Sequence, residues 1–548
     1  MMTAFPSCRS AAPMLRPILV AAAACLLAST ERAAADAIRT VALSDQIAPG
    51  FDEPFDWIID SGIAINDRGS VVFRGAVGEP RAYGIWREVD GNLSLVASEG
   101  DPAPGTPDVF GTFDSSDFVF DRPIINNQDV VLFAGTSRDD TSSRFGLWAQ
   151  PKVGEATLVA IEDRDLAPPD YQLVSHFRYT ANDRGEVAMH AAQDAGPDSA
   201  LLQGIAIDGL SLLVQESEVL GASGYHVDDI PRSQVWINDN GYGIVSAALE
   251  DDGANPHVGL LLTHPGEPAQ PLAVQEVAGE IGGAQTSYSY IAGGVNNRNT
   301  VVYTDQRFSR DDPSLFQQSL WEWSPSSGAE LLARTGEVHE DLGVTFVRIS
   351  HAVVNGNDQT AFLARTIDGE GQWSAQGLWL ESPDGVLTAV VEQGADAPGA
   401  AAQFLSVGDG ISVNRRGQIA FLGHLQGDGV TSDNSGGIWA TDADGQLQLV
   451  ARHGQTIDVS SDATTPDLRV IDRLYFYTNS NGNSPMSGLE DGRASPFNEA
   501  GEIVFDARFT DGTTGVFVSR LVAVPEPSVT LLAGVAALAA AGGGRRRA

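Results

Sequence analysis

Short runs of hydrophobic residues recur along this chain at a nearly constant interval. The segment Asn-Asp-Arg-Gly-Ser-Val-Val-Phe at residues 66–73 has degenerate copies at residues 126–133, 182–189, 238–245, 296–303, 355–362, 414–421 and 498–505. The copies begin 60, 56, 56, 58, 59, 59 and 84 residues apart and lead with Asn66, Asn126, Asn182, Asn238, Asn296, Asn355, Asn414 and Asn498. A long period in a strand-rich sequence indicates a propeller or a solenoid array.

The pattern within each copy predicts a tight turn followed by a strand. The fourth position is Gly69, Asp129, Gly185, Gly241, Asn299, Asp358, Gly417 or Gly501. Gly, Asn and Asp tolerate a positive φ best, so this position predicts a left-handed turn residue. The lead Asn can accept a hydrogen bond from the backbone two residues on, which closes an Asx-turn. We therefore interpret the eight asparagines as structural turn-formers rather than ligands.

Three further strands are expected in each unit. Gly84-Ile85-Trp86 recurs as Gly-Leu-Trp or Gly-Ile-Trp at residues 146–148, 377–379 and 437–439, with weaker copies elsewhere. A leucine-rich strand follows, and another apolar stretch precedes each Asn. Four strands in under 60 residues are typical of a propeller blade. The in-phase tryptophans are predicted to be core residues (Trp86, Trp148, Trp321, Trp379 and Trp439), whereas Trp57, Trp236, Trp323 and Trp373 are candidates for exposure.

The two ends of the repeat region predict a closed ring. The eighth unit stops after Gly515-Val516-Phe517 without its final strand, whereas residues 38–42 and Ala48-Pro49-Gly50 supply that strand and its loop. A circular permutation would remove an exposed sheet edge. We expect an all-β propeller of eight four-stranded blades at residues 36–524; seven blades or an open array are the alternatives. Residues 454–496 are expected to form an insertion loop.

The N-terminal segment has the three parts of a secretory signal peptide. Arg9 and Arg16 precede the apolar residues 17–29, and Ala33-Ala34-Ala35 forms a small-residue cleavage site. Residues 1–35 are therefore predicted to be removed before Asp36. Both cysteines, Cys8 and Cys25, fall inside this segment, so the mature chain would lack thiols. A lipoprotein acceptor role for Cys25 is disfavoured because apolar residues continue behind it.

The C-terminal segment at residues 525–548 also has three parts. Pro525-Glu526-Pro527 is followed by the Ala- and Gly-rich residues 528–544 and by Arg545, Arg546 and Arg547. This order resembles the PEP-CTERM sorting signal. The resemblance implies that an exosortase-type enzyme recognises Pro525, Glu526 and Pro527 and removes the tail. A simple C-terminal anchor, with the arginines held inside the cell, is the alternative. Either interpretation predicts an exported protein of the envelope or extracellular matrix that contacts the membrane only through this segment.

The repeats also resemble the N-x-x-G-x-x-A-F tandem repeats of bacterial surface proteins with interchangeable C-terminal anchors. The similarity extends over nearly all of the predicted mature chain. No chemistry is assigned to those repeats, so the resemblance implies location and fold rather than activity.

The net charge of the chain excludes some classes of binding partner. Net charge is −39, and because each predicted signal segment carries +2, the residues between them carry −43. Such a surface repels nucleic acid and anionic lipid, so neither is an expected partner. Hydrophobic residues make up 43% of the chain and charged residues 19%, which is enough apolar content for a packed core.

No catalytic constellation emerges from the motifs. The nine histidines form no close ligand pair, and no nucleophile elbow, Walker motif or dinucleotide fingerprint occurs. Calcium is the one small ligand with candidate residues, because Asp428 and Asp433, with Asp442 and Asp444, cluster carboxylates in polar loops. The expectation is otherwise no cofactor.

The sequence therefore predicts a non-enzymatic surface scaffold. Its expected partners are an extracellular polysaccharide or another envelope protein, in addition to the processing enzyme. The alternative is a polysaccharide hydrolase or lyase that uses loop carboxylates at the propeller mouth.

Overall fold

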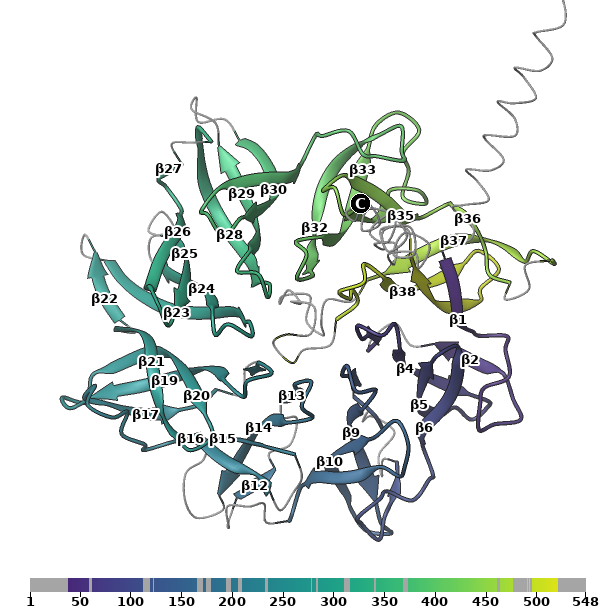
Figure 1. Cartoon of the computed structure of the whole chain (residues 1–548), viewed down its shortest axis with the longest axis horizontal. Coiled ribbons are helices and arrows are strands. Elements are labelled where there is room, and N and C mark those ends of the chain that lie inside the picture. The colour runs from purple at the N-terminus through teal and green to yellow at the C-terminus, as the bar shows by residue number, and fades with distance from the viewer. Residues whose placement is uncertain are drawn as a thin grey trace, which may run out of the picture.

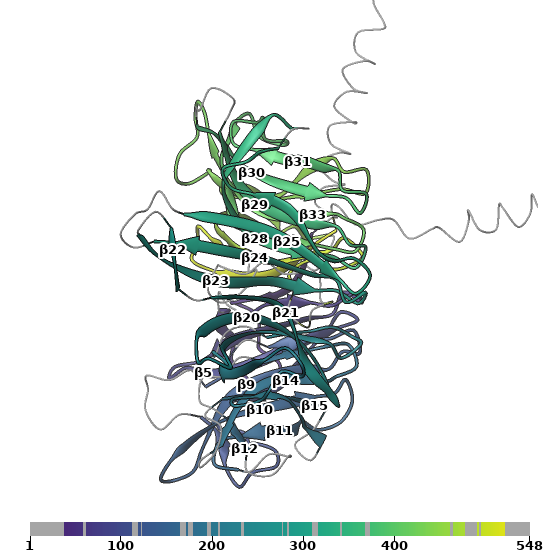
Figure 2. The same cartoon turned by 90° about the vertical axis from the view of Figure 1, so that its left-hand side faces the viewer.

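Each repeat copy folds into one small antiparallel sheet, and the eight sheets stand around a common axis as the blades of a propeller (Figure 1). The computed structural model describes residues 38–58, 62–111, 119–121, 123–164, 171–173, 179–193, 199–205, 209–231, 235–276, 278–281, 284–309, 316–339, 342–367, 373–460, 464–476, 490, 492 and 495–520. Seen from the side, strands of neighbouring blades cross the thickness of the disc (Figure 2). The predicted eight-bladed all-β propeller is confirmed, and the alternatives of seven blades or an open array are wrong.

Blades 1 to 4 share one design, in which the first strand is divided into two pieces that pair with the same neighbour. Blade 1 comprises β2 (Phe55–Ile58), β3 (Ala64–Ile65), β4 (Val71–Val77), β5 (Ala82–Val89) and β6 (Asn92–Ser98). Blade 2 comprises β7 (Val109–Phe110), β8 (Ile124–Ile125), β9 (Val131–Arg138), β10 (Ser143–Gln150) and β11 (Thr157–Ile161). Blade 3 comprises β12 (Tyr171–Leu173), β13 (Tyr179–Ala181), β14 (Val187–Gln193), β15 (Ala200–Gly204) and β16 (Ser211–Gln215). Blade 4 comprises β17 (Tyr225–Asp229), β18 (Trp236–Ile237), β19 (Gly243–Asp251), β20 (Pro256–His264) and β21 (Glu267–Glu276).

Blades 5 to 8 have a continuous first strand, and three of them add a short edge strand. Blade 5 comprises β22 (Ala278–Ile281), β23 (Ala284–Val295), β24 (Val301–Phe308), β25 (Gln317–Ser324) and β26 (Gly328–Arg334). Blade 6 comprises β27 (Val338–His339), β28 (Val344–Val354), β29 (Thr360–Ile367), β30 (Trp373–Glu381) and β31 (Leu387–Glu392). Blade 7 comprises β32 (Gln403–Val413), β33 (Ile419–Gln426), β34 (Gly436–Thr441) and β35 (Leu447–Arg452). Blade 8 comprises β36 (Thr456–Asp458), β37 (Leu468–Tyr475), β38 (Ile503–Phe509), β39 (Thr514–Ser519) and the N-terminal β1 (Ile38–Leu43).

The strand count departs from the prediction in a regular way. Among the described strands, blade 7 forms a plain four-stranded sheet and the other seven sheets contain five strands each. The fifth strand is either half of a divided first strand or a two- to four-residue edge strand such as β27. The predicted four strands thus form the common frame of every blade. The predicted insertion at residues 454–496 was too wide, because β36 and β37 belong to blade 8 and lie inside it.

The N-terminal strand closes the ring as predicted. β1 pairs antiparallel with β39, with Ile38 opposite Ser519 and Leu43 opposite Gly515. The amide of Ser44 extends this ladder by donating to the carbonyl of Thr514 at 2.9 Å. In Figure 1 the purple β1 lies beside the yellow strands that end the described chain. The last blade therefore has no free edge at β39.

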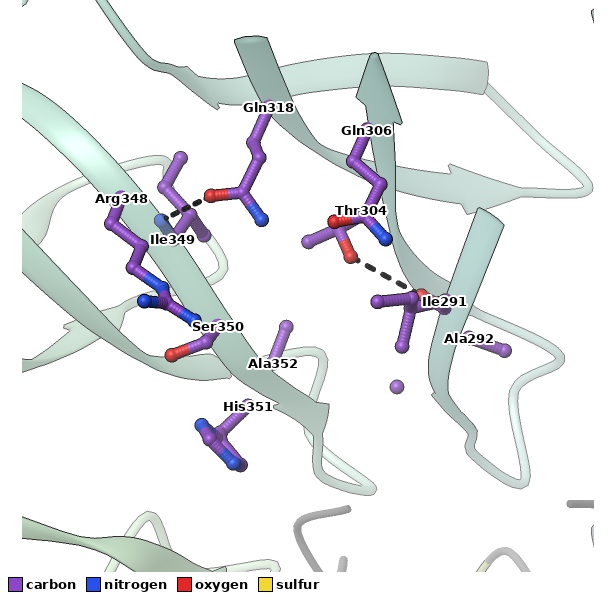
Figure 3. Close-up of a pocket in the computed structure, with 11 residues that line it drawn as sticks. Ile291, Ala292, Thr304, Gln306, Gln318, Arg348, Ile349, Ser350, His351 and Ala352 are labelled. Carbon is purple, nitrogen blue, oxygen red and sulfur yellow. Dashed lines mark hydrogen bonds between the residues drawn. The ribbon is translucent and has the colours of Figure 1, made fainter. Parts of the chain in front are cut away.

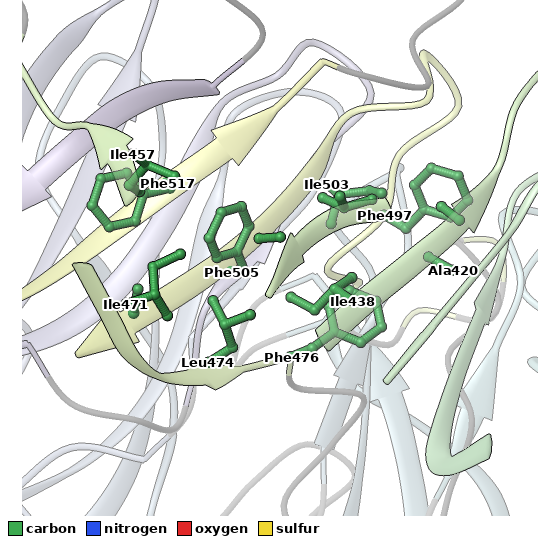
Figure 4. Packing of buried hydrophobic residues seen from close by; sticks show 14 of the residues in the cluster. Ala420, Ile438, Ile457, Ile471, Leu474, Phe476, Phe497, Ile503, Phe505 and Phe517 are labelled. Atoms are coloured by element: carbon green, nitrogen blue, oxygen red, sulfur yellow. The ribbon is translucent and has the colours of Figure 1, made fainter. Parts of the chain in front are cut away.

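Apolar residues alternate along the strands and meet between the blades. Every interface between neighbouring blades holds a hydrophobic cluster, including the one between blade 8 and blade 1. Figure 4 shows the cluster between blades 7 and 8, where Ile438 and Phe505 pack among the apolar residues of both sheets. Burial of such side chains contributes about 1.5–3 kcal/mol each, so these interfaces are the main source of stability.

The repeated tryptophans occupy the core with one exception. Trp86, Trp148, Trp379 and Trp439 are buried, and the indole nitrogens of three of them donate to the proline carbonyl of an Ala-Pro-Gly loop (Pro49, Pro104 and Pro398) at 3.0–3.1 Å. Trp321 is only half-buried, and its indole nitrogen donates instead to Asp305 of the neighbouring strand at 2.8 Å. Among the off-phase candidates for exposure, Trp236 is buried and Trp57 and Trp323 are half-buried.

The lead asparagines form their predicted turns. All eight fourth-position residues have a positive φ, from 57° at Asp358 to 88° at Gly241. The side-chain oxygen of each Asn accepts from the amides two and four residues on, as Asn66 does from Arg68 at 3.0 Å and Ser70 at 2.9 Å. All eight side chains are buried. The eight asparagines therefore close the turns that the repeat pattern predicts.

The asparagines also join the blades, which the sequence pattern did not reveal. Each side-chain nitrogen donates to the backbone carbonyl of the next lead Asn, at 2.7–3.3 Å. The eight bonds form a closed circle, which we call the asparagine belt. It holds the eight turns together at one end of the propeller axis.

Both predicted signal segments lie outside the described residues, including Pro525, Glu526, Pro527 and the three terminal arginines. Within the described ranges, no helix has the length and apolar character needed to span a membrane.

Candidate functional site

The predicted calcium residues lie in two loops of blade 7. Asp442 and Asp444 belong to the turn between β34 and β35, where one Asp442 carboxylate oxygen accepts from the amides of Asp444 (3.0 Å) and Gln446 (2.8 Å). Its other oxygen accepts from Gln448 at 3.0 Å. Asp428 and Asp433 lie in the loop before β34. Across the described parts of the chain, no three His, Cys, Asp or Glu side chains are grouped to hold a metal ion. Calcium binding stays a prediction.

A ring of side chains surrounds the axis directly beside the asparagine belt. It is formed by the residue after each lead Asn: Asp67, Asn127, Asp183, Asp239, Asn297, Gly356, Arg415 and Glu499. We call it the axial ring. Six of these side chains accept the backbone amide of the preceding member, at 2.7–2.9 Å. The ring is thus a second set of contacts from blade to blade.

Gly356 has no side chain to contribute, and Glu490 from the segment between β37 and β38 takes its place. A Cβ built on Gly356 would collide with the Glu490 carboxylate. Glu490 accepts from the amide of Asn297 at 3.4 Å and pairs with Arg415 through Nε at 2.7 Å. Two carbonyls of the same segment accept hydrogen bonds from other blades, Gly492 from Ala181 of blade 3 and Ser495 from Ile65 of blade 1. The described residues of this segment therefore contact blades 1, 3, 5 and 7.

Burial dominates the electrostatics of the axial ring. It raises the pKa of Asp183 to about 6 and that of Glu499 to about 7, and it also raises the pKa values of Asp67 and Glu490. Asp67 and Asp183 nevertheless use both carboxylate oxygens to accept hydrogen bonds from ring neighbours. Because those oxygens are occupied, we assign the ring a structural role.

A separate pocket of about 240 Å³ lies between blades 5 and 6 (Figure 3). Strands β23, β24 and β25 of blade 5 form one wall, and residues 348–352 of β28 form the other. The lining residues are Ile291, Ala292, Gly293, Thr304, Gln306, Gln318, Arg348, Ile349, Ser350, His351 and Ala352. The pocket is small against the roughly 300–1,000 Å³ of drug-sized ligand sites, so it has room only for a small chemical group.

Irregular strands create this space. β23 is bulged between Ala292 and Gly294, and β28 is bulged between Ser350 and Val353. The strands approach most closely at the bulges, where a Cβ on Gly293 would collide with the carbonyl of Ala352. His351, in the second bulge, has a φ of 55°. A left-handed non-glycine residue costs about 1–3 kcal/mol and is often found at functional sites.

The pocket wall presents hydrogen-bond donors. Gln318 is only 5% exposed, and its side-chain oxygen accepts from the amide of Ile349 at 3.0 Å. Its amide nitrogen is therefore the atom offered to the pocket (Figure 3). Gln306 and Arg348 contribute further donors, while Thr304 donates to the carbonyl of Ile291 at 3.5 Å. No Asp or Glu is among the described residues that line it.

Sequence reasoning missed this pocket. Residues 301–303 match residues 71–73 of the first unit, so Gln306 stands where that unit has the apolar Ala76. The corresponding position is also polar in four other units (Thr136, Arg365, His424 and Arg508), so the repeat pattern carried no signal for the pocket. The asparagines, by contrast, recur in all units because all units need the turn.

Comparison with known families assigns most of the propeller to one group. A model described as "Family of unknown function (DUF7453)" matches residues 65–531, which includes all of blades 2 to 7. The chain belongs to the DUF7453 family. No curated protein matches it.

Solved structures give this DUF7453 member only distant likenesses. The Dos1 propeller is 9% identical with a TM-score of 0.39, over 89% of this chain and 96% of that one. The polysaccharide lyase Uly1 is 7% identical with a TM-score of 0.36, over 77% and 94%. An α-L-arabinanase from Penicillium chrysogenum is 13% identical with a TM-score of 0.25, over 63% and 98%. At these values no function is transferred from them.

Proposed function

We propose that this protein is an exported envelope or extracellular-matrix protein whose propeller binds polysaccharide without chemical conversion. The observation that carries the proposal is the pocket between blades 5 and 6, which offers donors from Gln306, Gln318 and Arg348 and no carboxylate. Sugar recognition depends on such convergent polar groups in a small concave site.

The alternative, a hydrolase or lyase that uses loop carboxylates, lacks support at this pocket. Glycoside hydrolysis ordinarily needs two carboxyl groups on either side of the scissile bond. The buried carboxyls of the axial ring, such as Asp67 and Asp183, accept hydrogen bonds from neighbouring turns instead. Their bonding supports a role in the scaffold.

The export part of the proposal rests on the two ends of the chain. The signal-peptide pattern at residues 1–35, the sorting pattern at residues 525–548 and the charge of −39 all favour a protein that works outside the cell. The absence of cysteine between these segments fits a fold stabilised by packing and by backbone pairing alone.

Binding of residues 36–524 to a glycan array, with and without calcium, tests the proposal. This range contains every strand of the described propeller. We expect selective binding to a subset of glycans. Release of sugar from any of the glycans, without retained binding to one of them, would overturn the proposal. Glycan binding that depends on calcium would support the calcium site predicted around Asp442.

A further inference from the structure

We propose that the pocket between blades 5 and 6 binds the carboxylate of an acidic sugar, so that the polysaccharide recognised contains uronic acid residues. This inference rests on the proposed polysaccharide binding and specifies its ligand.

Three described lining side chains, Gln306, Gln318 and Arg348, carry N–H donors. The buried Gln318 presents its amide nitrogen, because the amide of Ile349 already occupies its oxygen. Within the described part of the chain, neither Gln306 nor Arg348 has a side-chain hydrogen bond or ion pair. An arginine offers five N–H groups in a plane that matches a carboxylate. The ligand group that satisfies these donors is an anion with two acceptor oxygens.

A second arginine lies beside Arg348 in blade 6, although it does not line the pocket. Arg348 on β28 lies directly opposite Arg365 on β29 in the ladder of blade 6. Neither forms an ion pair with another described residue, although the chain as a whole carries a charge of −39. Like charges directly opposite each other destabilise a sheet. A bound carboxylate would offset this repulsion, and this offers a physical reason for two arginines to lie opposite each other.

The rest of the lining suits a sugar ring. Ser350 and Thr304 are hydroxyl-bearing, and Ile291 is 47% exposed and offers an apolar surface to the C–H face of a pyranose. The volume of about 240 Å³ limits the bound group to roughly one residue. The acidic surface beyond the pocket repels densely charged polymers. A polysaccharide with widely spaced uronic acids is therefore the expected ligand.

The test uses two matched probes, uronic-acid oligosaccharides and the same oligosaccharides with their carboxyl groups reduced to alcohols. Calorimetry with residues 36–524 is expected to show at least about tenfold tighter binding of the acidic probe, the effect of one charge-assisted contact. Arg348→Gln should remove this preference. Arg473→Gln, at an exposed position on β37 in blade 8, removes the same charge far from the pocket and should leave binding unchanged.

A second variant separates loss of the site from loss of the fold. Gln306→Ala truncates a half-buried lining side chain and should weaken both probes while thermal unfolding stays as in the parent. Equal binding of acidic and reduced probes would overturn this inference and leave the proposed function standing. Preference for acidic peptides over both probes, dependent on Arg348, would also overturn it. Conversion of the probes to products would overturn the proposed function as well.

Discussion

The side-chain nitrogen of Asn498 donates to the carbonyl of Asn66 at 2.9 Å, although 432 residues separate the two in sequence. This bond closes the asparagine belt between blade 8 and blade 1. β1, which leads into blade 1, pairs with β39 inside blade 8, and Arg39 of β1 forms an ion pair with Glu88 of blade 1 at 2.6 Å. Three different kinds of contact therefore close the ring: a side-chain hydrogen bond, a strand pairing and an ion pair.

Replacing a belt asparagine by aspartate should destabilise the propeller. Asn238→Asp keeps the oxygen that closes the turn but loses the nitrogen that donates to the carbonyl of Asn296 and to the Asn299 side chain, both at 2.7 Å. The buried carbonyl of Asn296 and the half-buried side-chain oxygen of Asn299 would then face a carboxylate, at a cost of about 3 kcal/mol. Chemical denaturation measures this loss in the free energy of unfolding.

The matched control is Asn92→Asp, in the exposed hairpin between β5 and β6. It makes the same chemical change outside the belt and should alter the free energy of unfolding by less than about 0.5 kcal/mol. Similar losses in the free energy of unfolding of the two variants would show that the hydrogen bonds of the asparagine belt add no stability of their own.

Removal of β1 should open the ring. A chain that begins at residue 44 would leave the edge of β39 unpaired, and unpaired strand edges promote association between chains. We expect oligomers or aggregates in size-exclusion chromatography, and recovery of monomer when a peptide of residues 36–50 is added. A monomeric, fully folded truncated chain would argue against closure by β1.

Stability should fall as the pH rises from 5 to 8. Burial raises the pKa of Asp183 to about 6 and of Glu499 to about 7, from ordinary values of 3.8 and 4.5. A raised carboxyl pKa favours the neutral acid in the fold, so its contribution is complete below the unfolded value and is lost as the pH passes the folded value. Burial also raises the pKa of Glu381 to about 7, which adds to this effect, whereas burial lowers the pKa of His453 to about 4 and opposes it below pH 6.5. Because three carboxyls outweigh one imidazole, thermal unfolding at pH 5 and pH 8 should show the higher Tm at pH 5.

Glu499→Gln checks the source of this dependence. Glutamine keeps an oxygen for the amide of Arg415 but cannot ionise, so the variant should lose less stability than the parent between pH 5 and pH 8. Exposed groups with lowered pKa values, such as Asp139 at about 2, act only below this range. An unchanged slope in the variant would mean that other groups set the pH dependence.

Replacement of Pro525, Glu526 and Pro527 by alanine should change where the protein accumulates. If the motif directs cleavage and delivery, the variant should remain in the membrane fraction with its tail attached. Replacement of the neighbouring Ser528 by alanine serves as the control. Identical fractionation of the parent and the alanine variant would defeat the sorting prediction.

Much of the fold could be predicted because the residue types that recur in the repeat point directly to what the backbone of each blade requires. A position that is always Gly, Asn or Asp reveals a left-handed turn, as φ values of 77° at Gly69 and 61° at Asp129 confirm. A missing last strand and an extra first one reveal ring closure. Such signals survive the divergence of the copies because every blade has the same backbone requirement.

The candidate site could not be predicted from the repeat, since it depends on departures from it. Glu490 lies outside any copy, and it completes the axial ring only because Gly356 leaves room for it. The pocket depends on bulges in β23 and β28, and a one-residue bulge is invisible in a pattern of alternating apolar residues. Arg348 and Gln318 become neighbours only when two blades pack together.

Recovery of the bound ligand tests the central claim, that this propeller binds polysaccharide without converting it. Residues 36–524 would be incubated with the glycans they select, and the sugar would be released by denaturation and weighed by mass spectrometry. The account predicts that the parent retains glycans of unchanged mass and that Arg348→Gln retains fewer. Shortened or unsaturated products, formed by the parent and not by the variant, would contradict it.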